Sequence, residues 1–102
     1  MSMVKRRNWP TIVCDILEAT RTPLSKTKIM YKANLNFARF HRYFDDLVAK
    51  GFIEEVDGSG RGAAYLATDR GRTLLTVLRT ARDLVFGEQM IKDAFVHRDE
   101  SV

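Results

Sequence analysis

The stretch from Lys26 to Val56, KTKIMYKANLNFARFHRYFDDLVAKGFIEEV, constrains the fold of this chain more than any other. Two segments with the apolar spacing of helices lie only three residues apart, and a glycine and a run with strand propensity follow them. Asn34 tolerates the left-handed conformation of a tight turn, and Asn36 is a good cap for the next helix. A connection this brief fixes the angle between two helices, so the stretch predicts a helix-turn-helix.

The second helix of this pair, predicted over residues 37–50, has two contrasting faces. One face is an apolar stripe expected to anchor the helix in the core, formed by Phe37, Phe40, Phe44, Leu47 and Val48. The opposite face carries Arg39, Arg42 and Asp46, and Asp46 is spaced to pair with Arg42 one turn earlier. Arginines on such a helix can bond guanine edges or phosphates in a DNA major groove.

Another helix is predicted before this motif. Residues 9–21 have helical apolar spacing, Asn8 is a plausible cap, and Pro23 breaks the helix. Its apolar face consists of Trp9, Ile12, Val13, Ile16, Leu17 and Ala19. Ser25 is placed to cap the short helix of the motif, which turns Ile29, Met30 and Ala33 inward.

A β-hairpin and a long helix are predicted after the motif. Gly51 occupies a helix C-cap position. The segments 52–56 and 63–68 are predicted to pair across the glycine-rich turn DGSGRG. Thr68 is expected to cap a last helix that reaches about Val96.

This order of elements is the layout of a winged helix-turn-helix. The predicted fold class is mainly α with a small β-hairpin, in which residues 1–68 form the DNA-binding domain. Residues 69–97 form a long C-terminal helix that pairs two chains in a coiled-coil-like way, and residues 98–102 form a tail.

The long C-terminal helix has an apolar band wider than one small domain can cover. We therefore expect a homodimer, although the helix folding back over its own core is the alternative. The expected dimer contacts are Leu74, Val77, Leu78, Ala81, Leu84, Val85, Ile91 and Phe95.

Charge is concentrated in the half of the chain that contains the motif. The net charge is +4, but residues 1–50 carry ten Lys/Arg against four Asp/Glu, while residues 51–102 carry seven against nine. A basic face of this kind indicates a polyanion such as double-stranded DNA as the partner. The candidate DNA-binding residues are Lys26, Lys28, Lys32, Asn36, Arg39, Arg42, Tyr43, Ser59 and Arg61.

Several of these candidates have a second interpretation. The three lysines surround the short helix, where DNA phosphates run, but they also suit a solvated surface. Asn36 is a stronger candidate for a cap than for reading a base, and Tyr43 for packing than for bonding a phosphate. Arg61 and Ser59 lie at the tip of the hairpin, where an exposed arginine between two glycines has little structural use.

Catalysis and metal chemistry have little support in the sequence. No nucleophile–base pair and no cofactor motif is present, so we expect no enzyme activity and no cofactor. No small-molecule ligand is evident, and an effector bound at the dimer interface stays an open alternative. Cys14 is the only cysteine and lies in an apolar helical pattern, which predicts a buried structural thiol. His41 and His97 are far apart in sequence, so no zinc site is expected, and His41 borders the phenylalanine stripe.

No apolar run is long enough to span a membrane and no export signal is evident, so a cytoplasmic, nucleoid-associated protein is expected.

The motif residues also resemble a known family. KTKIMYKANLNFARFHRYFDDLVAKGFIEE, followed by YLATDRGRTLL, is similar to archaeal winged helix-turn-helix proteins related to the small dimeric chromatin proteins of crenarchaea. The second segment contains a Y-x-x-T-x-x-G feature at Tyr65, Thr68 and Gly71. The resemblance covers about residues 5–80 and implies a DNA-binding dimer paired through its C-terminal helix.

The function predicted from the sequence is that of a dimeric DNA-binding protein, with helix 36–50 in the major groove and hairpin 52–68 as the wing. A transcription regulator is the leading form of this prediction. The alternatives are a non-specific chromatin-type DNA binder and a winged-helix module that binds protein.

Overall fold

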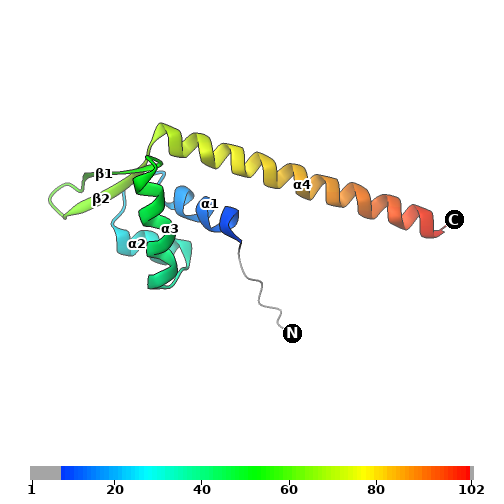
Figure 1. The fold of residues 1–102 in the computed structure, drawn as a ribbon, viewed down its shortest axis with the longest axis horizontal. Helices are drawn as coiled ribbons and strands as arrows, with labels where there is room; N and C mark the ends of the chain where they lie inside the picture. The colour runs from blue at the N-terminus through cyan, green and yellow to red at the C-terminus, as the bar shows by residue number, and fades with distance from the viewer. Residues whose placement is uncertain (1–7, 102) are drawn as a thin grey trace.

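The computed structural model describes residues 8–101, with side chains through Val85. Over this range the chain forms α1 (Trp9–Ala19), α2 (Lys26–Ala33), α3 (Phe37–Ala49), β1 (Ile53–Asp57), β2 (Ala63–Ala67) and α4 (Asp69–Ser101) (Figure 1). The first three helices cluster beside the hairpin, and α4 projects away from them (Figure 1). The predicted fold class, mainly α with a small hairpin and a C-terminal helix, is confirmed.

The predicted caps set the starts of the first three helices. The side chains of Asn8, Ser25 and Asn36 accept hydrogen bonds from backbone N–H groups in the first turns of α1, α2 and α3. The end of α1 was predicted wrongly, since the helix stops at Ala19 and not at Arg21. The last turn tightens before Pro23, since the backbone N–H groups of Thr20 and Arg21 bond the Leu17 and Glu18 carbonyls, three residues back, at 3.2 and 3.3 Å. The buried Thr20 hydroxyl also donates to the Ile16 and Leu17 carbonyls, at 3.0 and 3.1 Å.

Two residues with positive φ make the tight connections around α3. Asn34 ends α2 at φ 56°, ψ 52°, the left-handed conformation expected from the sequence. Gly51 follows α3 at φ 82°, where its missing side chain removes the steric cost. These two turns set the direction of α3 relative to α2 and the point at which the chain enters β1.

The hairpin gains a third short segment that the sequence did not predict. β1 and β2 pair antiparallel, with Ile53 opposite Ala67 and Asp57 opposite Ala63. Leu24, between α1 and α2, exchanges two backbone hydrogen bonds with Tyr65 at 3.2 and 2.8 Å. The hairpin is therefore attached to the segment just before α2, and the wing and the helix-turn-helix form one unit.

The core lies between the first three helices, the hairpin and the first turns of α4. Its largest fully buried side chains are Phe40, Phe44, Ile12, Ile16, Leu17, Ile29 and Ile53. Two members of the predicted apolar stripe are not in it, since Phe37 is 69% and Val48 36% exposed, and Trp9 of α1 is also exposed. These residues lie at the edges of their stripes and near helix ends, beyond the arc that neighbouring elements cover.

Helix α4 begins inside this core and then leaves it. Leu75 is buried, and Leu74 and Leu78 pack partly against the core. The helix runs to Ser101, past the end predicted near residue 96, because residues 88–101 contain neither glycine nor proline to stop it. The molecule is therefore elongated, 66 × 32 × 20 Å. None of the helices in the described range is long and apolar enough to cross a membrane.

Candidate nucleic-acid interface

Helix α3 presents its arginines on the side away from the buried phenylalanines. Arg42 is exposed and forms no ion pair with the part of the chain that the structure describes, while Arg39 is half-buried. The side chain of Asn36 accepts from the backbone N–H of Arg39 at 2.8 Å, so its amide oxygen serves as the helix cap. The cap orients the first turn of α3, where base-contacting residues of a major-groove helix lie.

The carboxylates of α3 pair with neighbours other than Arg42. Asp46 bonds Lys50 at 2.6 Å, so the predicted Asp46–Arg42 pair is wrong, because the lysine one turn ahead reaches the same carboxylate. Asp45 lies 3.7 Å from the Nδ1 atom of His41. Positive charge thus remains toward the first half of α3, and both carboxylates are in the second half.

The three predicted lysines do not share one face. Lys28 lines a groove between α2 and the wing. The ammonium of Lys26 lies 5.6 Å from the ring centroids of both Phe44 and Tyr65, so part of its role is to join α2 to the hairpin. Lys32 lies beside Asp15 and Glu18 of α1, in a separate surface pocket. Of the three, Lys28 is best placed for a partner that contacts the wing.

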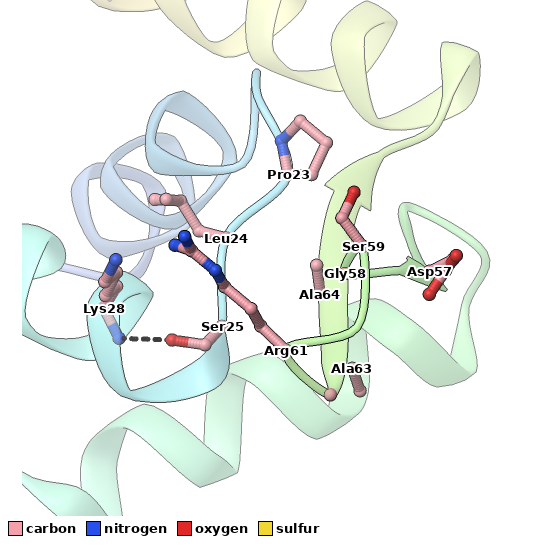
Figure 2. Close-up of a pocket in the computed structure, with 11 residues that line it drawn as sticks. Pro23, Leu24, Ser25, Lys28, Asp57, Gly58, Ser59, Arg61, Ala63 and Ala64 are labelled. Carbon is pink, nitrogen blue, oxygen red and sulfur yellow. Dashed lines mark hydrogen bonds between the residues drawn. The ribbon is translucent and has the colours of Figure 1, made fainter.

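The tip of the wing turns Arg61 toward α2. Ser59, Gly60 and Gly62 have φ values of 59°, 82° and 91°, which produce a sharp turn around the arginine. The Arg61 side chain points across the groove to the side where Ser25 and Lys28 lie (Figure 2). Ser59 lies on the same turn and is exposed.

The groove between α2 and the wing has a positive character. Asp57 is the one carboxylate among its lining residues, and its side chain points away from Arg61 (Figure 2). Arg61 and Lys28 come from segments 33 positions apart and converge because Leu24 pairs with β2. Two cations on one open groove suit a single phosphate group of a polyanion.

Three further aromatic residues belong to α2 and α3, and one of them was not predicted to matter from the sequence. Tyr43 packs partly buried against the core, the interpretation favoured from the sequence. His41 is mostly buried, and its ring centroid lies 5.2 Å from that of Phe40. Tyr31 on α2, 73% exposed, was not singled out from the sequence. Its position two residues from both Ile29 and Ala33, the buried residues of α2, was the signal that could have found it.

The predicted dimer contacts divide between the core and solvent. Leu74 and Leu78 pack against the chain's own core, whereas Val77, Ala81, Leu84 and Val85 are exposed. Ile91 and Phe95 lie on α4 where side chains are outside the described residues.

Within the described residues, no group of three His, Cys, Asp or Glu side chains could hold a metal ion.

Comparison with known proteins identifies the family. The model of the winged helix-turn-helix family matches residues 6–86, most of the chain. The chain belongs to the winged helix-turn-helix family. A winged helix-turn-helix assignment accounts for the short α2–α3 connection and for the hairpin that follows α3.

One relative is similar over most of this chain. An uncharacterized protein of Methanocaldococcus jannaschii is 33% identical over 85 residues, which are 82% of this chain and 38% of that protein. The chain thus spans well under half the length of this relative.

Two solved structures share the fold. Sso10a-2, described as a DNA-binding protein from Sulfolobus solfataricus, has a TM-score of 0.78 at 23% identity and covers 89% of this chain and 95% of its own. The PcaV transcriptional regulator of Streptomyces coelicolor has a TM-score of 0.58 at 20% identity, covering 89% of this chain and 75% of its own. At these identities the likeness concerns the fold.

Proposed function

We propose that this protein is a homodimeric DNA-binding protein that regulates transcription, with α3 in the major groove and the β1–β2 hairpin as the wing. The observation that carries the proposal is the convergence of Lys28 and Arg61 on one groove, next to a helix whose outward face holds Arg42. The fold brings Lys28 of α2 and Arg61 of the wing to one groove, although they are 33 positions apart in sequence, and Arg42 is exposed on α3. A DNA duplex offers phosphates on both sides of a groove and so matches this distribution.

The roles of the individual residues follow from their positions. Arg42 and Arg39 contact base edges or the groove walls, since they lie in the first half of α3. Lys28, Arg61 and Ser59 contact backbone phosphates beside the groove. Such contacts fix the register of the protein on DNA and carry no sequence information directly.

The relatives' descriptions support the same proposal. Sso10a-2 is described as a DNA-binding protein and PcaV as a transcriptional regulator, and both share the fold of this chain. A protein with this role would act at the nucleoid.

The decisive experiment measures binding to DNA directly. Fluorescence anisotropy with labelled mixed-sequence duplexes, at two salt concentrations, compares the intact protein with Arg39→Ala/Arg42→Ala. We expect the double variant to bind at least about ten-fold more weakly, since arginine contacts to bases contribute roughly 1–3 kcal/mol each. Higher salt should weaken the binding of the intact protein steeply.

A matched control separates the α3 face from general charge loss. Arg21→Ala/Lys32→Ala also removes two positive charges, but Lys32 lies beside Asp15 and Glu18, and Arg21 pairs with Glu18. This control should keep its affinity within about two-fold. Equal losses in both double variants, or no binding by the intact protein at low salt, would refute the proposal and favour a protein-binding module.

Selection of duplexes from a random pool then tests regulation against chromatin-type binding. A regulator should enrich a defined site with two half-sites, because a symmetric dimer places two recognition helices in a fixed relation. Steep salt dependence without any enriched sequence would instead identify the chromatin-type binder.

A further inference from the structure

Phe37 is the one phenylalanine of α3 that its own fold does not bury. Phe40 and Phe44 on the same helix are 1% exposed, whereas Phe37, the first residue of α3, is 69% exposed. Leaving such a side chain in water forgoes the stabilisation that its burial would give. The residue therefore contributes little to the core, although its sequence pattern places it there.

The ring of Phe37 is nevertheless held in place. Its centroid lies 4.3 Å from that of His41, with the rings tilted at 54°. His41 in turn contacts Phe40 and lies 3.7 Å from an Asp45 carboxylate oxygen, so it is supported from both sides. One face of the Phe37 ring is packed, and most of its remaining surface is open to a partner.

The surroundings of Phe37 combine apolar groups with one cation. A small cleft between α2 and α3 is lined by Lys26, Thr27, Met30, Phe37, Phe40 and His41, and none of these is a carboxylate. An apolar ring beside one cation, Lys26, suits a partner that has an apolar group within an anionic surface. The edge of a DNA major groove has one such group, the 5-methyl of thymine.

We propose that Phe37 packs against the 5-methyl group of a thymine and so gives the protein a preference for thymine at that position. The proposal rests on the proposed function, because it needs α3 in the major groove. Residues at the start of a recognition helix reach the base edges, and Phe37 is the first residue of α3. The start of α3 is the end of that helix farthest from the hairpin and α4 (Figure 1).

The test removes only the methyl group. Labelled duplexes of alternating dA and dT, and of alternating dA and dU, present the same base edges except for the 5-methyl. The intact protein should bind the dT duplex more tightly by about four-fold for each methyl group covered. Phe37→Ala should lose the part of the preference that this contact supplies, and Phe37→Leu should recover some of it.

Two controls isolate the contact from other effects. Removing the methyl also changes duplex flexibility, but this change acts equally on the intact protein and on Phe37→Ala, so the difference between them reports the contact. Trp9→Ala removes another exposed aromatic, 58% exposed at the start of α1, and should keep the full dT preference. Circular dichroism checks that each variant is folded.

The outcomes distinguish the two proposals. Binding to both duplexes with no dT preference, or a preference unchanged in Phe37→Ala, would overturn the thymine contact while leaving DNA binding intact. Absence of binding to any duplex, including the mixed-sequence pool, would overturn the proposed function and the thymine contact together.

Discussion

At the scale of single residues, Gly71 illustrates how a sequence motif can have a purely steric cause. A side-chain carbon built at Gly71 would lie 2.0 Å from the carbonyl oxygen of Phe52 and 3.3 Å from Leu17. Gly71 is therefore the point where α4 passes directly over the start of the hairpin. The glycine of the Y-x-x-T-x-x-G feature marks this close approach.

Replacing Gly71 with alanine should destabilise the protein, although the same change usually stabilises a helix. Gly→Ala inside a helix normally stabilises by up to about 1 kcal/mol. We expect Gly71→Ala to destabilise by about 1–3 kcal/mol, because backbone must move to admit the methyl group. Urea denaturation measures the change, and Thr73→Ala, at an exposed site on the same helix, should be neutral or stabilising. A stabilised Gly71→Ala protein would contradict the close approach.

Cys14 shows the chemical consequence of burial at a single residue. Burial raises the pKa of the Cys14 thiol above its ordinary value of 9.0, and this outweighs the lowering effect of Arg82 and Arg79. The group therefore stays protonated at neutral pH, and the thiolate is the reactive form. We expect the folded protein to react slowly with Ellman's reagent at pH 7–8 and quickly once unfolded in denaturant. Equally fast reaction in both states would contradict this placement.

At the scale of elements, Thr68 connects three of them. Its hydroxyl donates to the Gly51 carbonyl at 2.7 Å, which lies just after α3, and accepts from the Gly71 N–H at 3.0 Å in the first turn of α4. Its backbone N–H also bonds the Phe52 carbonyl at 3.0 Å. The end of α3, the start of β1 and the start of α4 are thus fixed by one side chain and its backbone.

Removing the Thr68 hydroxyl should loosen this junction. Thr68→Ala loses a helix cap and a second hydrogen bond, so we expect a loss of about 1–2 kcal/mol in the free energy of unfolding. Thr68→Ser keeps the hydroxyl and should retain most of the stability, which chemical denaturation of the two variants would show. Similar stability of both variants would mean that the hydroxyl bonds contribute little.

At the scale of the whole molecule, α4 determines the shape. After its first turns the helix extends beyond the domain (Figure 1), and Leu84 and Val85 are each 66% exposed. Arg79 is paired with Glu18 of α1, which holds the base of the helix against the domain. A helix that extends beyond the domain with exposed apolar residues is suited to pair with a second copy, as the proposed dimer requires.

A single charge on α4 should separate the proposed dimer. Leu84→Asp places a carboxylate among the exposed apolar residues, so we expect light scattering to give the 11.7 kDa mass of one chain, and twice that mass for the intact protein. DNA affinity should fall at least about ten-fold, since the two halves no longer bind together. Thr76→Asp, at an exposed position on another side of α4, should stay dimeric. An intact protein with the mass of one chain would refute the dimer.

Much of the fold is determined by the sequence alone, because the interactions involved are local. Asn8, Ser25 and Asn36 each cap the helix that immediately follows, and Asn34 and Gly51 adopt the turn conformations their chemistry favours. Capping bonds and backbone conformations depend on residues within a few positions, so a sequence displays them directly. The buried centres of the apolar stripes follow from helical periodicity for the same reason.

The tertiary structure alone decides which edges of those stripes are covered and where the charged side chains point. Phe37 is exposed although it belongs to the same stripe as the buried Phe40, and Lys32 lies on the α1 side although Lys28, one turn away, faces the wing. Arg61 turns toward α2 because Leu24 pairs with Tyr65, which no local pattern indicates. These outcomes depend on contacts between segments distant in sequence, and they decide which side chains are available to a partner.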